Sequence, residues 1–208
     1  MVAIANNSIR AFIAIELPTT LKTMLSALQQ DMRKSVPSGI RWVEANNIHL
    51  TLKFLAEISD ATKLMIIDKL HVICPSLIPF TLRTETLGAF PNKRHPRILW
   101  LGFNGDIEAL FLLQKTIDSA LIPLGFVPEK RPFEPHLTLA RVKEGAAASI
   151  QQSLSETITK TSWNPADSWT VNSIALMRST LLPSGPEYNR LAEIHLGNHE
   201  QPLSAGGV

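Results

Sequence analysis

The sequence predicts an α+β fold in which two related lobes enclose a cleft. Three observations favour it. The tetrad His-Leu-Thr-Leu occurs at residues 49–52 and again at 136–139, and the two histidines are 136 − 49 = 87 residues apart. Segments with strand-type alternation and segments with helical spacing follow one another along the chain. Two of the helical segments lead towards a tetrad. We therefore expect an internal duplication, with the lobes related by a pseudo-twofold axis.

The first half contains strands and helices with clear local signals. From Ser8 to Glu16, apolar residues alternate as in a strand with one core face. Pro18 then suits the first turn of a helix that runs to about Lys34, because a missing N–H costs little there. The remaining elements expected are a short strand at 40–43, a strand at 49–55, a helix capped by Ser59 or Asp60 with Leu64, Ile67, Leu70 and Ile73 on one face, and a strand at 80–90.

The second half repeats this mixture. We expect a strand at 97–103, a helix after Asn104-Gly105-Asp106, the second tetrad strand to about Val142, a helix at 146–160, and strands at 170–180 and 187–196. The Pro-rich segments 91–96 and 123–135 resemble loops between packed elements and not flexible linkers. Residues 1–208 are therefore expected to form one bilobal domain, with 197–208 as a loose tail.

Composition narrows the class of protein. The chain has 208 residues, 45% of them hydrophobic, and a formal net charge of +2, which is compatible with nucleic acid but does not indicate it. One cysteine, Cys74, excludes an internal disulfide framework. Residues 1–7 lack the features of a signal peptide, and no apolar run approaches about 18 residues. We expect a cytoplasmic monomer that does not cross a membrane.

The repeated tetrad is the candidate site. Because successive strand side chains point to opposite faces, each copy places a His and a Thr on one face and two leucines on the other. A lone His in a strand is usually structural, but two identical tetrads favour a shared function. Zinc is a weak alternative, because two histidines lack the third and fourth ligands and the other histidines show no ligand spacing with them.

Paired histidines suit acid–base catalysis at phosphorus. One neutral imidazole removes a proton from water while one imidazolium protonates the leaving oxygen, and the ordinary imidazole pKa lets both forms coexist near neutral pH. A Thr hydroxyl two residues after each His can donate to a non-bridging phosphate oxygen. This chemistry needs no metal and no cofactor.

The chain resembles the two-histidine (2H) phosphoesterase superfamily and, within it, the LigT-type RNA 2′,3′-cyclic phosphodiesterases, also called 2′-5′ RNA ligases. The resemblance runs through residues 10–15, 42–43, 47–55, 88–91, 96–102, 135–141, 176–179 and 185–188. One departure is Ala56, where the family commonly has Gly. The resemblance implies a bilobal LigT-like fold, with an antiparallel sheet and flanking helices in each lobe and an active-site cleft between them.

The resemblance also implies an activity: opening a 2′,3′-cyclic phosphate at an RNA end to leave a 2′-phosphate, with a 2′-5′ ligation of tRNA halves as related chemistry in reverse. By analogy His49 is the proton donor and His136 the proton acceptor, and Thr51 and Thr138 bind phosphate oxygens. The alternatives are a 2H enzyme acting on a small cyclic nucleotide, on ADP-ribose cyclic phosphate or on 2′-5′ oligonucleotides, and a non-catalytic module that binds RNA ends.

Three further residues are candidate substrate contacts. Arg141 follows the second tetrad, and a guanidinium matches phosphate geometry. Strand parity places it on the leucine face, so it reaches the cleft only if the strand ends or bulges there; the alternative is a salt bridge. Lys53 has the parity of His49 and contacts phosphate or stays a solvated rim charge. Phe12 stacks on a nucleobase or belongs to the core.

Overall fold

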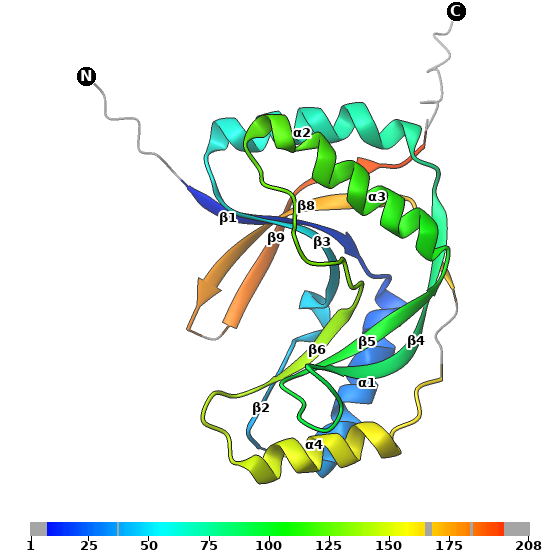
Figure 1. The fold of residues 1–208 in the computed structure, drawn as a ribbon, viewed down its shortest axis with the longest axis vertical. Coiled ribbons are helices and arrows are strands. Elements are labelled where there is room, and N and C mark those ends of the chain that lie inside the picture. The colour runs from blue at the N-terminus through cyan, green and yellow to red at the C-terminus, as the bar shows by residue number, and fades with distance from the viewer. Residues whose placement is uncertain (1–7, 37, 165–167, 184, 198–208) are drawn as a thin grey trace, which may run out of the picture.

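The computed structural model describes residues 8–36, 38–164, 168–183 and 185–197, and it confirms the two-lobed α+β fold (Figure 1). The helices are α1 (Thr19–Ser35), α2 (Asp60–Ile73), α3 (Ile107–Ala120) and α4 (Ala148–Lys160), with short 3₁₀ turns η1 (Ala45–Asn47), η2 (Cys74–Ser76) and η3 (Ile122–Leu124). The strands are β1 (Ile9–Glu16), β2 (Ile40–Trp42), β3 (His49–Ile58), β4 (Phe80–Phe90), β5 (Ile98–Gly105), β6 (Leu137–Val142), β7 (Trp169–Val171), β8 (Ser173–Leu182) and β9 (Gly185–His195). Most of the tail predicted at 197–208, and the terminal residues 1–7, lie outside the described residues.

The strands form a curled antiparallel sheet. Its order is β7-β4-β5-β6-β3-β1-β8-β9, and β2 also pairs with β6. Within the described chain, the pairing between β3 and β6 consists of Leu50 opposite Leu137. This narrow junction divides the sheet into a half made of β3, β1, β8 and β9 and a half made of the other strands. One tetrad therefore lies on each side of the junction.

Helices α1 and α3 cross between the two halves of the sheet and connect them. Helix α1 follows β1 but packs near β2 and β6, where the Gln29 side-chain amide donates to the carbonyl oxygens of Val43 (2.7 Å) and Leu139 (2.9 Å). Helix α3 follows β5 but contacts β3 and α2. Figure 1 shows α2 and α3 over the β1, β3, β8 half, and α1 and α4 beside the β2, β4, β5, β6 half. Each half of the sheet is consequently packed against a helix that follows a strand of the other half.

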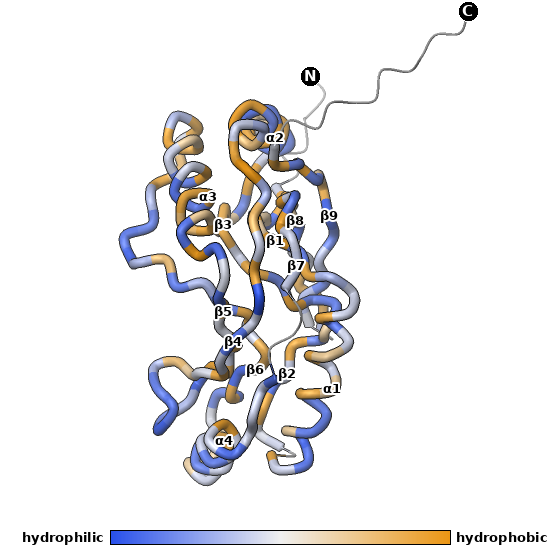
Figure 2. Tube along the Cα trace, turned by 90° about the vertical axis from the view of Figure 1, so that its right-hand side faces the viewer, coloured by the Kyte–Doolittle hydropathy of each residue, from blue (hydrophilic) through white to orange (hydrophobic). Residues whose placement is uncertain are grey.

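The core lies between the helices and the sheet. Hydrophobic and hydrophilic residues alternate along strands and around helices (Figure 2), as an amphipathic layer requires. The predicted buried face of α2 is partly wrong: Ile66 and Leu70 are buried, whereas Leu64 is 58% exposed. Because α2 carries apolar residues around much of its circumference, spacing alone did not identify the face that packs. The cap is Ser59, whose Oγ accepts from the Thr62 N–H at 3.1 Å.

The strand predicted at 170–180 is in fact two strands in different halves. β7 pairs with β4, whereas β8 pairs with β1 and β9, so the chain passes between the halves at Asn172.

The departure noted at Ala56 also has a structural meaning. Ala56 has a φ of 57° where β3 is irregular, a left-handed conformation that a glycine adopts at lower cost.

Candidate active site

The two tetrads meet at the sheet junction. Leu50 and Leu137 oppose each other and are 1% and 0% exposed, so both leucine side chains enter the core. The histidines and threonines on either side of these leucines are half-buried and, by strand alternation, face the opposite side. In antiparallel register, residue 49 lies towards 138 and residue 51 towards 136. The placement expected for His49, Thr51, His136 and Thr138 therefore follows from one backbone contact.

Both imidazoles are held in the same way. His49 Nδ1 lies 2.8 Å from the carbonyl oxygen of Asn47, and His136 Nδ1 lies 2.7 Å from the carbonyl oxygen of Glu134. A carbonyl oxygen only accepts, so each Nδ1 carries the proton and donates. In the neutral ring, Nε2 is then left without a proton and with a free lone pair. The geometry is matched, because in each case the carbonyl belongs to the residue two positions before the histidine.

An aromatic wall surrounds His49. The Phe12 ring stacks on the imidazole with centroids 4.6 Å apart, and the Tyr188 ring meets it edge-on at 5.0 Å. Phe12 is 3% exposed. The nucleobase-stacking role predicted for Phe12 is therefore not supported, because His49 and Tyr188 cover its ring. Burial lowers the pKa of His49 to about 4; the hydrogen bond to Asn47 opposes this change, and the charge of Lys22 adds to it.

His136 has a different wall. Phe90 meets it edge-on with centroids 5.0 Å apart, and the Trp100 ring lies 6.5 Å away. Trp100 reaches this position by crossing Gly88, where an added Cβ would lie 2.2 Å from the indole. The absence of a side chain at residue 88 thus permits the wall beside His136. The two histidines share an orientation but differ in their surroundings.

A bulge brings Arg141 to the histidine face. Leu99 pairs with Ala140 but Trp100 pairs with Thr138, so the register shifts by one residue at Leu139. Leu139 and Ala140 are both buried, and Arg141 beyond them is exposed. The condition stated for Arg141, a bulge, is therefore met. Burial raises the pKa of Tyr188, and the charges of Arg141 and Arg10 oppose this, which places Arg141 within electrostatic range of the His49 wall.

An equivalent bulge removes Lys53 from the site. Ile13 pairs with Lys53 but Ala14 pairs with Thr51, so the register shifts at Leu52. Leu52 follows His49 by three residues, just as Leu139 follows His136 by three residues. The predicted placement of Lys53 beside His49 is therefore wrong. Lys53 is 8% exposed, forms an ion pair with Asp118 of α3 and donates to the Val127 carbonyl.

The residue that takes the place expected for Lys53 is Phe54. Phe54 is 72% exposed, and its ring centroid lies 6.3 Å from that of Phe12. It stands five residues after His49, as Arg141 stands five residues after His136. Sequence reasoning missed Phe54 because strict alternation placed it with the core-facing leucines. Comparing the two tetrads residue by residue would have drawn attention to the position.

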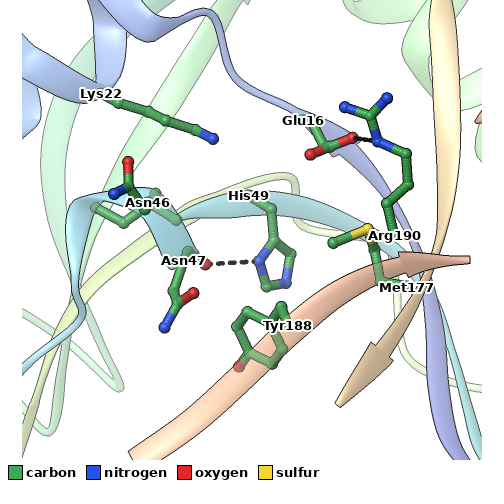
Figure 3. Close-up of a pocket in the computed structure, with 9 residues that line it drawn as sticks. Glu16, Lys22, Asn46, Asn47, His49, Met177, Tyr188 and Arg190 are labelled. Atoms are coloured by element: carbon green, nitrogen blue, oxygen red, sulfur yellow. Dashed lines mark hydrogen bonds and ion pairs between the residues drawn. The ribbon is translucent and has the colours of Figure 1, made fainter. Parts of the chain in front are cut away.

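A cavity of about 450 Å³ adjoins His49 (Figure 3). Its lining comes from β1, α1, η1, β3, β8 and β9, and consists of Glu16, Lys22, Asn46, Asn47, Ile48, His49, Met177, Tyr188 and Arg190. His136 is not among these described lining residues. Arg190 is paired with Glu16 at 2.7 Å and also with Glu193. Most of this lining was not predicted, because it comes from segments distant in sequence.

Two further findings concern metals and membranes. Among residues 8–36, 38–164, 168–183 and 185–197, no group of three or more His, Cys, Asp or Glu side chains is arranged to hold a metal ion. Within the same residues, every helix is too short or too polar to cross a membrane.

Comparison with known proteins identifies the family. The model of the LigT like Phosphoesterase family matches residues 15–100 and again 102–188, so each match contains one tetrad. The chain is 34% identical over 185 residues to an RNA 2′,3′-cyclic phosphodiesterase of Methanocaldococcus jannaschii, covering 88% of this chain and 99% of that protein. It is 30% identical over 190 residues to the Aquifex aeolicus protein of the same name, covering 91% and 98%.

Solved structures agree with this assignment. A Thermus thermophilus crystal structure superimposes with a TM-score of 0.72 at 28% identity, covering 91% of this chain and all of that one. The crystal structure of E. coli LigT complexed with 3′-AMP superimposes with a TM-score of 0.71 at 25% identity, covering 92% and 100%. The repeated tetrad, the two-lobed sheet and these matches agree: the chain belongs to the LigT-like phosphoesterase family of 2H phosphoesterases.

Proposed function

We propose that the protein hydrolyses 2′,3′-cyclic phosphate ends of RNA to 2′-phosphates by two-histidine acid–base catalysis. The observation that carries this is the matched orientation of the imidazoles, each with Nδ1 bound to the carbonyl two residues before it and Nε2 free. Relatives named RNA 2′,3′-cyclic phosphodiesterase, about 30% identical over most of this chain, support the choice of substrate.

In this mechanism His136 is the base and His49 the acid. Nε2 of His136 removes a proton from water, whose oxygen attacks phosphorus in line with the ribose 3′-oxygen. The bond from phosphorus to the 3′-oxygen breaks, and that oxygen takes the proton from Nε2 of His49. The 2′-oxygen stays bound, so the product is a 2′-phosphate. Each imidazole contributes on the order of 10²–10⁴-fold in rate.

Other side chains stabilise the charge that develops on the phosphate. The hydroxyls of Thr51 and Thr138 donate to the two non-bridging oxygens, one from each half of the sheet. The exposed guanidinium of Arg141 lies on the same face after its bulge and adds a positive charge. These groups act on the transition state more than on the substrate, because negative charge grows on the equatorial oxygens as water attacks.

To act as the acid, His49 must become protonated when the substrate binds. A pKa of about 4 leaves its imidazole neutral at pH 7 in the free protein. An anionic phosphate beside the ring favours the protonated form and raises that pKa. If the roles were exchanged, His49 would act as the base and would have to be neutral. Protonation of His49 would then lower kcat/KM only below about pH 4.

With the 5′-hydroxyl of a second RNA in place of water, the same site would join that RNA to the 2′,3′-cyclic phosphate end. Nε2 of His136 removes the proton of the 5′-hydroxyl, whose oxygen attacks phosphorus, and the 3′-oxygen leaves with the proton from Nε2 of His49. The histidines therefore keep their roles in ligation and exchange them only when a 2′-5′ linkage is cleaved back to the cyclic phosphate, and tRNA halves are the expected substrates. The ligase activity thus needs no residues beyond those already described.

The decisive experiment is a cleavage assay in EDTA with RNA that ends in a 2′,3′-cyclic phosphate. Wild type, His49→Ala, His136→Ala and a control, His71→Ala on the exposed surface of α2, are compared. The proposal expects a 2′-phosphate product from wild type and the control and a loss of at least about 10²-fold in either site variant. Near-wild-type activity in either variant would exclude the two-histidine mechanism. A 3′-phosphate product would reverse which oxygen leaves.

A further inference from the structure

We propose that the cavity beside His49 binds a phosphate group on the 5′-oxygen of the nucleotide whose cyclic phosphate is opened, and that Lys22 is its cationic partner. This inference rests on the function proposed above and specifies which part of the substrate lies on which side of the site. It would make the enzyme distinguish a nucleotide with a 5′-phosphate from one without it.

The direction of the reaction places the nucleoside next to the cavity. In an in-line displacement the attacking water and the leaving oxygen lie on opposite sides of phosphorus. The leaving 3′-oxygen belongs to the ribose, so the rest of the nucleotide lies on the side of the general acid, His49. The cavity also adjoins His49, and its volume of about 450 Å³ falls within the usual range for small-molecule sites.

The charges in the cavity point to an anion near Lys22. Arg190 is already neutralised by Glu16 and Glu193. Lys22, half-buried in the first turn of α1, has no ion-pair partner among the described residues. Figure 3 shows Lys22 and Asn46 on one side of the His49 ring and Arg190 on the other. An ammonium and a neighbouring side-chain amide are both donors that a phosphate accepts from.

Lys22 is also coupled to the chemistry. Burial is the main cause of the low pKa of His49, and the positive charge of Lys22 lowers that pKa further. A ligand phosphate that pairs with Lys22 neutralises that charge and so favours the protonated imidazole that an acid catalyst needs. A 5′-phosphate would therefore increase both binding and the fraction of His49 that carries a proton.

The test compares three cyclic phosphates of one base. These are adenosine 2′,3′-cyclic phosphate, its 5′-phosphorylated form, and the dinucleotide ApA with a 2′,3′-cyclic phosphate end. Wild type is compared with Lys22→Met, Lys22→Gln and a control from the same helix, Lys34→Met, whose side chain is 78% exposed and paired with Asp31. The readout is the ratio of kcat/KM with and without the 5′-phosphate, because a ratio cancels changes common to both substrates.

We expect the 5′-phosphate to raise kcat/KM by about tenfold or more in wild type and Lys34→Met. This is the increase that one added hydrogen bond to a charged group gives. In both Lys22 variants the ratio should fall towards one. A ratio near one in wild type, or one that persists in the Lys22 variants, overturns the proposal. A gain with the dinucleotide identifies an RNA phosphodiester as the group bound; a gain confined to the monophosphate identifies a small nucleotide.

A binding measurement separates this inference from the proposed function. Calorimetric titration compares adenosine 2′,5′-bisphosphate with adenosine 2′-phosphate, and needs no turnover. If wild type cleaves none of the cyclic phosphates, the proposed function fails, yet tighter binding of the bisphosphate that depends on Lys22 still supports the cavity assignment. Equal affinities for the two ligands overturn it whatever the activity.

Discussion

Acidification should destabilise the folded protein through His49 in particular. Burial lowers the pKa of this imidazole from 6.5 to about 4 in the folded chain. Between these values the unfolded chain binds a proton at residue 49 and the folded chain does not. The free energy of unfolding therefore falls as the pH drops from above 6.5 to below 4. At about 1.4 kcal/mol per pH unit, the His49 contribution amounts to about 3 kcal/mol.

The measurement is urea unfolding at pH 7 and at pH 4 for wild type and His49→Gln. Carboxylates titrate in the same interval in both proteins, so the difference between the proteins isolates residue 49. We expect the loss of stability on acidification to be about 3 kcal/mol smaller in His49→Gln than in wild type. His71→Gln, which removes an exposed imidazole of α2, serves as the control and should behave as wild type.

The result that refutes this reasoning is an equal pH dependence in wild type and His49→Gln. It would mean that Phe12 and Tyr188 do not keep water from the imidazole as the structure indicates. A direct check is the NMR titration of the His49 ring, which should have its midpoint near pH 4 in the free protein and higher when adenosine 2′-phosphate is bound. A midpoint that does not move on binding would contradict His49 as the acid.

Three other substitutions test particular parts of the structure. Ala56→Gly should stabilise the protein by about 0.5–1 kcal/mol in urea unfolding, because the φ of 57° is costly for alanine; a loss of stability would contradict this. Gly88→Ala should lower kcat by about tenfold or more, because its Cβ displaces Trp100 from the wall beside His136, and unchanged kcat would show that this wall is dispensable. Lys53→Met should lower the free energy of unfolding by about 3 kcal/mol, because it leaves the largely buried Asp118 without its ion-pair partner. The double variant Lys53→Met/Asp118→Leu should recover much of this stability. A large loss of activity at unchanged stability would instead indicate that Lys53 belongs to the site.

The sequence by itself determined the features that depend on neighbouring residues. Alternation in each tetrad was enough to place the leucines in the core and the His and Thr side chains on the other face. It also located most strands and helices, because their apolar periodicity is local. The repetition of the tetrad was enough to predict two related lobes, before any contact between them was known.

Tertiary structure decided what depends on the partner strand or on distant segments. The bulges at Leu52 and Leu139 arise from how β3 and β6 pair with their neighbours, and each reverses the alternation beyond it. They send Lys53 into an ion pair and turn Arg141 towards the histidines, opposite to strict parity. The low pKa of His49 and the cavity beside it likewise require side chains from β1, α1 and β9 to converge, and no local pattern encodes that convergence.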